Sequence, residues 1–167
     1  MLTKYFKHSL VALTIVALLP CFGHAVETKN PLADFEWMLG GEWKSGSTIQ
    51  LFEWGLDQRT VKASSYVLSG DERVLASEGF WFWHPQDKVI KGFFVAKGMP
   101  FYMIESEAEF DGRKFIHRLK TYSENDDPQR YVEVIEPKSG DVFSWQLFAG
   151  ESIGGKPLMS ERFQRIS

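Results

Sequence analysis

The sequence predicts an all-β protein, an antiparallel up-and-down barrel of about ten strands with a short N-terminal helix that closes one end. From Glu42 onward the apolar residues recur with a period of two, which is typical of strands. Turn-forming groups interrupt this pattern at residues 55–57, 69–71, 84–87, 97–98, 111–112, 125–128, 138–141 and 154–155. Consecutive tight hairpins favour a meander over a sandwich, and closure into a barrel removes the exposed sheet edges.

A helix is expected before the first strand. Asn30 is a suitable N-cap residue, Pro31 suits the first helical position, and Gly40 is a C-terminal stop signal. The apolar side chains between them fall on one side at helical spacing: Leu32, Phe35, Met38 and Leu39. We expect this helix to lie across one mouth of the barrel.

One strand alternates clearly between apolar and acidic side chains. Its even positions are expected inside the barrel: Tyr102, Ile104, Ala108 and Phe110. Its odd positions form an acidic stripe of Glu105, Glu107 and Glu109. Paired carboxylates are what glycoside hydrolysis requires, but carboxylates two residues apart on an exposed strand are more typical of solubilising charge. The stripe is therefore predicted to face water.

Two later strands show the same period. Phe143, Trp145 and Leu147 share one face, as do Met159, Phe163 and Arg165 in the last strand. By contrast, residues 80–83 and 93–95 are apolar on both faces. One face of each is expected to line the interior, and the other to be covered by the helix, the termini or a partner such as a second copy in a homodimer.

The first 25 residues are predicted to be a signal peptide. Lys4 and Lys7 form a basic start, and a short apolar run from residue 10 to residue 19 follows. Small residues at Gly23 and Ala25 suit cleavage after Ala25, which leaves residues 26–167 as a single lipocalin-like domain, periplasmic or secreted. Lipid attachment at Cys21 is the alternative, but the preceding proline is a poor match for such sites.

Charge and cysteine content exclude two classes of function. Without Lys4 and Lys7 the chain has 17 basic against 22 acidic side chains, a formal charge of −5, and we find no concentrated basic face. Nucleic acid is therefore not an expected partner. Cleavage after Ala25 also removes Cys21, the only cysteine, so the mature domain has no thiol nucleophile and no disulfide.

Three features together resemble a known superfamily: Gly41-Glu42-Trp43 at the start of the first strand, the run of antiparallel strands, and an arginine in the last strand. The chain resembles the calycins, which include lipocalins, fatty-acid-binding proteins and nitrobindin-like barrels. The resemblance implies that Trp43 packs across the closed end and that Arg165 covers it, with Arg162 as the alternative. Lipocalin cysteines and extended loops are absent, so a fatty-acid-binding or nitrobindin-like variant fits better.

We expect the barrel to hold a small apolar or amphipathic molecule. The chain has 14 Phe and 6 Trp, a content typical of apolar pockets. His117 alternates with Phe115 and Leu119, which places its imidazole inside. The predicted lining is Trp81, Trp83, Tyr102, Phe115, His117 and Trp145.

Two other interpretations stay open. The first is a cavity enzyme with His117 as acid or base and with Tyr102 or Arg118 holding a carbonyl or carboxylate group. The second is a structural or interaction protein of the cell envelope, its barrel filled by its own aromatic side chains. The volume of the cavity separates this second interpretation from ligand binding.

No cofactor or metal site is expected from the motifs. The sequence has no His-x-His, His-Glu-x-x-His or acidic calcium loop, and no Gly-x-Ser-x-Gly elbow. Nitrobindin-like barrels bind haem through a histidine in a C-terminal element, but no histidine follows His117 in this chain. Haem is therefore only a secondary possibility.

Overall fold

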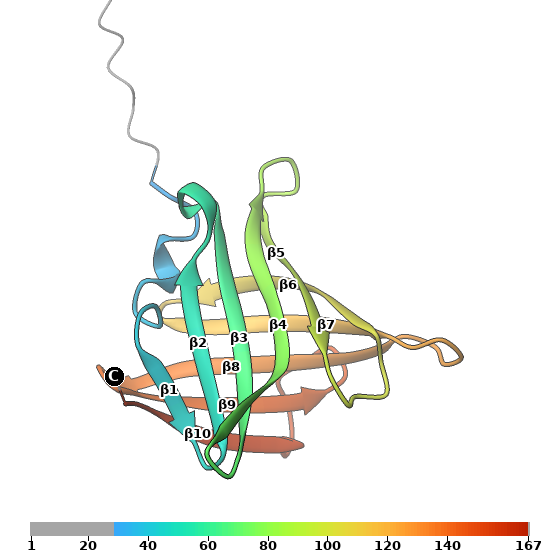
Figure 1. Ribbon diagram of the computed structural model, residues 1–167. Helices are drawn as coiled ribbons and strands as arrows, with labels where there is room; N and C mark the ends of the chain where they lie inside the picture. Colours follow the sequence, from blue (N-terminus) through green and yellow to red (C-terminus); the bar gives the residue numbers. More distant parts are fainter. Residues whose placement is uncertain (1–28, 167) are drawn as a thin grey trace, which may run out of the picture.

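Ten antiparallel strands close into a barrel in the computed structural model, which describes residues 29–166 (Figure 1). The strands are β1 (Glu42–Ser45), β2 (Thr48–Trp54), β3 (Thr60–Ser69), β4 (Glu72–His84), β5 (Val89–Ala96), β6 (Met103–Asp111), β7 (Lys114–Tyr122), β8 (Gln129–Ser139), β9 (Val142–Ala149) and β10 (Met159–Arg165). Each strand pairs with the next one along the chain, and β1 pairs with β10 to close the barrel. The predicted all-β antiparallel barrel is confirmed.

Figure 1 shows how the barrel is flattened into two walls. Strands β2, β3 and β4 run across β8, β9 and β10. Side chains from the two walls meet in the interior, as Phe52 of β2 and Phe143 of β9 do with ring centroids 6.4 Å apart. The closing seam is short, with Trp43 opposite Arg165 and Lys44 opposite Gln164. The predicted signal peptide, residues 1–25, lies outside the described residues.

The predicted N-terminal helix is wrong. The segment contains only a 3₁₀ turn, η1 (Ala33–Phe35), and a second 3₁₀ turn, η2 (Leu56–Gln58), precedes β3. Around η1 the backbone hydrogen bonds run from an N–H to the carbonyl three residues earlier, as from Phe35 to Leu32 and from Met38 to Phe35. A 3₁₀ helix has about three residues per turn, so side chains three residues apart lie directly above one another. An α-helix has about 3.6 residues per turn, so the same side chains are offset around its axis. The apolar spacing of three residues suits the tighter turn.

The N-terminal turn fills one end of the barrel with side chains. Leu32, Phe35 and Met38 are essentially inaccessible to water and belong to the main core cluster. The Phe35 ring lies between aromatic rings of the barrel wall, with centroid distances of 5.2 Å to Trp81, 4.9 Å to Phe110 and 5.0 Å to Phe115. This end is therefore packed solid.

Trp43 lies at the same end and is fully buried. Its indole Nε1 donates to the carbonyl of Met38 at 2.8 Å, and the guanidinium carbon of Arg165 lies 4.1 Å from its ring centroid. Arg165 also donates to the Trp37 carbonyl at 3.0 Å, to the Leu39 carbonyl at 3.2 Å and to the carbonyl of Gly40. One arginine of the last strand thus fixes both the tryptophan and the N-terminal turn.

The strands that are apolar on both faces leave aromatic rings outside the barrel. Phe80 and Phe93 face each other across β4 and β5 and are 40% and 38% exposed. Trp81 and Phe94, one residue further on, are buried inside. Within residues 29–166 neither the N-terminal turn nor a terminus covers the outer rings, and no helix has the length and hydrophobicity that crossing a membrane needs.

Candidate functional site

The half of the barrel away from the N-terminal turn is hollow. A cavity of about 380 Å³ is lined by residues from β2 to β10 and by the β5–β6 loop. Because Val67 and Met99 of this lining are 41% and 57% exposed, we place the mouth of the cavity there, next to Ala96 at the end of β5. Its floor is formed by Trp81, Phe94, His117, Glu133 and Trp145.

Two glycines keep the floor open by letting aromatic rings lie close to the wall. A Cβ atom built at Gly79 would fall under 3.0 Å from the ring of Phe94 and from the Phe93 carbonyl oxygen. A Cβ atom at Gly92 would fall equally close to Trp81 and Phe94. Because these positions carry no side chain, the rings occupy the space beside the strands.

A chain of hydrogen bonds links the polar groups of the floor. The indole Nε1 of Trp81 donates to Nε2 of His117 at 3.0 Å, and Nδ1 of His117 lies 2.7 Å from Oε2 of Glu133. The other oxygen of Glu133, Oε1, accepts from the indole Nε1 of Trp145. The residues come from four strands, β4, β7, β8 and β9.

The donor at Trp81 fixes which ring nitrogen of His117 carries the proton. An indole N–H can only donate, so the bond from Trp81 requires a lone pair on Nε2. The remaining proton of the neutral ring is then on Nδ1, where it is donated to the Glu133 carboxylate. A second proton on Nε2 would oppose the N–H of Trp81 and break the chain.

Glu133 is held as a carboxylate. Burial by itself raises its pKa, but the hydrogen bonds donated by Nδ1–H of His117 and by the N–H of Trp145 outweigh burial and leave the pKa below its ordinary value. The Glu133 side chain is 17% exposed, compared with 3% for His117. The Glu133 side chain is therefore more accessible from the cavity than the imidazole is.

The predicted lining residues divide into two groups. Trp81, His117 and Trp145 lie on the cavity surface. Phe115 is inside the barrel but belongs to the solid end, where it contacts Phe35 and Phe110. Trp83 packs partly buried against the main core cluster and does not line the cavity.

Tyr102 does not line the cavity and is 65% exposed, contrary to the predicted inward face. The strand β6 begins at Met103, so the alternation does not extend back to Tyr102. Arg118, the other proposed partner of His117, points outward and pairs with Glu109 at 2.7 Å. Neither side chain shares the interior with the imidazole.

Sequence reasoning missed Glu133 and Gln50. Glu133 interrupts an apolar run from residue 131 to residue 135 at the middle of β8, and this is the signal that could have identified it. Gln50 lines the cavity wall, and its side-chain oxygen is buried without a donor among the described residues. Buried polar groups without partners are uncommon in proteins and mark places where a ligand can complete the bonding.

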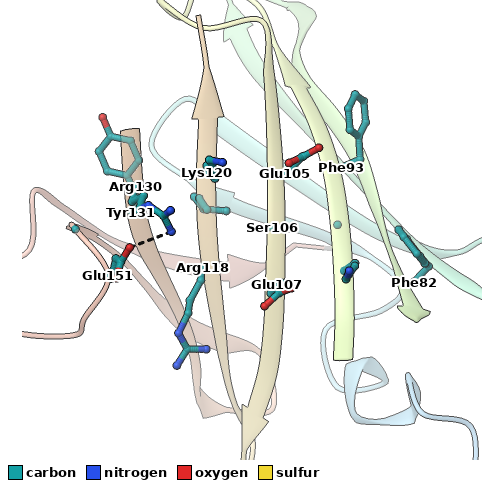
Figure 2. A pocket seen from close by; sticks show the side chains of 14 residues that line it. Phe82, Phe93, Glu105, Ser106, Glu107, Arg118, Lys120, Arg130, Tyr131 and Glu151 are labelled. Carbon is teal, nitrogen blue, oxygen red and sulfur yellow. Dashed lines mark ion pairs between the residues drawn. The ribbon is translucent and has the colours of Figure 1, made fainter. Parts of the chain in front are cut away.

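A second hollow, about 720 Å³, lies on the outer face of the sheet (Figure 2). Its lining includes Glu105 and Glu107 of the predicted acidic stripe, which lie opposite Lys120 and Arg118 on β7. Arg130 pairs with Glu151 at 2.9 Å, which Figure 2 marks by a dashed line. Basic and acidic groups balance each other here, as on a solvated strand face.

Comparison with known proteins adds no family assignment. No family model matches the chain, and no curated protein matches it. The closed antiparallel barrel of ten strands is consistent with a calycin-like fold. Among residues 29–166, no three His, Cys, Asp or Glu side chains gather in a way that could hold a metal ion.

Proposed function

We propose that this protein binds a small apolar or amphipathic molecule inside the barrel, as an exported binding protein. The observation that carries the proposal is the hollow of about 380 Å³ with aromatic walls and a few convergent polar groups. Ligand sites are typically apolar clefts of about 300–1,000 Å³ in which a small number of polar groups fix the orientation. The cavity lies at the small end of that range.

The packing of the barrel supports binding over a purely structural role. The N-terminal turn and Trp43 fill one end, while the other end stays hollow although it is lined by aromatic rings. A barrel filled by its own side chains would have no space of this size. A carboxylate such as Glu133 is also unfavourable as a purely structural core residue, since an ionised group in a low-dielectric interior reduces stability unless it is well paired.

The site supports acid–base catalysis less well than it supports ligand binding. A general base needs a free lone pair within reach of the substrate, and the Nε2 lone pair of His117 accepts the Trp81 N–H. Tyr102 and Arg118, which were expected to assist, lie outside the cavity. The imidazole here orients and supports the carboxylate.

Titration with a neutral fluorophore tests the proposal. We expect N-phenyl-1-naphthylamine to quench the tryptophan emission of the purified protein in a saturable way, because Trp81 and Trp145 lie on the cavity surface. Ala96→Phe places a ring at the cavity mouth and is expected to weaken binding at least tenfold. Val95→Phe is the matched control, since Val95 is 39% exposed and absent from the cavity lining.

Two results would contradict the proposal. The first is linear quenching without saturation. The second is equal weakening by Ala96→Phe and Val95→Phe, because that would place the binding site on the outer surface of β5 rather than in the interior.

A further inference from the structure

The charge of the cavity indicates what kind of polar head its ligand carries. The ionisable side chains on the lining are Lys97, His117, Glu133 and Glu161. Lys97 and Glu161 are exposed, and Glu161 accepts a hydrogen bond from the hydroxyl of Ser45 at 2.6 Å. Glu133 is therefore the charged group in the depth of the cavity, and it is negative.

The surrounding hydrogen bonds do not neutralise this charge. Trp145 donates from an uncharged indole, and His117 donates from a ring that Trp81 keeps neutral. A carboxylate offers about four lone-pair positions, of which these two donors occupy one on each oxygen. Acceptor capacity thus remains on a side chain that is partly accessible from the hollow.

The walls around the carboxylate also favour a cation. The rings of Trp81, Phe94 and Trp145 line the same floor, and aromatic faces attract ammonium groups by about 0.5–2 kcal/mol. Gln50 adds an oxygen acceptor without a donor among the described residues. A fatty acid would instead bring its carboxylate towards Glu133, and the cationic side chain on the lining, Lys97, is exposed rather than deep in the cavity.

We infer that the ligand is a small amphipathic amine, whose ammonium group pairs with the Glu133 carboxylate while its apolar part lies among the aromatic rings of the cavity. This inference rests on the proposed function, because it names the ligand class of the same cavity. The His117 ring acts as a positioning residue that holds the carboxylate towards the hollow. Trp81 and Trp145 serve both as hydrogen-bond donors and as apolar wall.

Three probes of equal chain length test the inference at neutral pH: decylammonium, decanol and decanoate. Each displaces N-phenyl-1-naphthylamine, and the displacement constants are compared. We expect decylammonium to bind at least tenfold more tightly than decanol, and decanol to bind more tightly than decanoate. This ranking is measured on the unaltered protein, so it does not depend on how a variant folds.

The variant Glu133→Gln keeps the shape of the side chain and removes its charge. We expect it to lose at least tenfold in affinity for decylammonium while its affinity for decanol stays within about threefold. Glu107→Gln is the matched control, because Glu107 is an exposed carboxylate on the outer face of β6. We expect that substitution to leave all three constants unchanged.

The outcomes separate the two proposals. If the fluorophore binds saturably but the three probes bind alike, or decanoate binds best, the amine inference is overturned while ligand binding stands. The inference is also overturned if folded Glu133→Gln binds decylammonium as well as the unaltered protein does. If neither the fluorophore nor any probe binds saturably, the proposed function itself fails.

Discussion

Glu133 shows how a single side chain sets the chemistry of a largely apolar interior. It lies half-buried on β8 between β7 and β9, where His117 donates an N–H to one of its oxygens and Trp145 donates an N–H to the other. A buried carboxylate without these donors would become neutral, because the low-dielectric interior disfavours its charge. The two donors are therefore what makes the carboxylate available to a ligand.

The pH dependence of stability provides a test at this residue. The pKa of Glu133 in the folded protein is below the ordinary value of 4.5. In the unfolded chain the group binds a proton more readily, so its contribution to stability is present above about pH 4.5 and is lost as the pH falls through the folded pKa. We expect the free energy of unfolding of Glu133→Gln to fall less steeply below pH 4.5 than that of the unaltered protein.

Urea denaturation across a series of pH values measures this slope. Glu107→Gln is a suitable control, because Glu107 is an exposed carboxylate on the outer face of β6. Equal slopes for Glu133→Gln and the unaltered protein would show that the carboxylate is not held ionised by its neighbours.

Alternation along one strand was enough to place His117 inside the barrel, but it could not identify Glu133. The position of His117 follows from its own strand, where Phe115 and Leu119 share its face. The role of Glu133 depends on donors from two other strands, and these are brought together only by the register of β7, β8 and β9. A glutamate in a strand otherwise predicts an exposed position.

Among the elements, β4 and β5 show why glycine is needed inside a barrel wall. Gly79 and Gly92 lie on the inward face, where the rings of Trp81 and Phe94 occupy the space that a Cβ atom would need. We expect Gly79→Ala to lower the free energy of unfolding by about 1–3 kcal/mol or more, because the new methyl group overlaps the Phe94 ring and the backbone of β5. Thermal or urea denaturation measures the change.

Gly140→Ala is the matched control for that substitution. A Cβ atom at Gly140 meets nothing within 4 Å. Its substitution is expected to change the free energy of unfolding by about 0.5 kcal/mol or less, as is usual for surface positions. If Gly79→Ala were as mild as Gly140→Ala, the wall of β4 and β5 would have to be looser than the structure indicates.

The N-terminal turn shows a limit of pattern reading at the level of elements. Residues 32, 35 and 38 are three apart, and this spacing is compatible with one face of either an α-helix or a 3₁₀ turn. Which of the two conformations the segment adopts depends on its packing against the end of the barrel. Arg165 and Trp43 donate to carbonyls at residues 37–40, and these bonds hold the end of the segment against the barrel.

For the whole molecule, the sequence predicted closure but could not predict the hollow. Tight turns between successive strands favour a meander, and a meander of this length removes its edges by closing. Whether the interior is filled depends on where each inward-facing ring packs. Alternation along a strand predicts that a ring faces inward, but not which end of the barrel it occupies. Phe115 packs in the solid end, whereas Trp145 lies on the cavity surface.

The integrity of the barrel as a whole depends on the seam between β1 and β10, where Arg165 joins three parts of the molecule. It lies over Trp43 and donates to carbonyls of the N-terminal turn. We expect Arg165→Ala to lower the free energy of unfolding by about 1–3 kcal/mol, because partly buried carbonyls lose a charged donor and the indole loses its cation. Hydrogen exchange should also quicken at the amide of Gly40, which bonds to the Phe52 carbonyl at 3.2 Å.

Arg162→Ala separates this role from the mere loss of a positive charge. Arg162 lies on the same strand but is exposed, opposite Ser144 on β9. Its substitution is expected to shift stability by about 0.5 kcal/mol or less and to leave the exchange of Gly40 unchanged. Equal effects of the two substitutions would mean that the seam is held by strand pairing alone. A selective effect of Arg165→Ala would mean that the solid end, and with it the depth of the cavity, is held in place by one arginine.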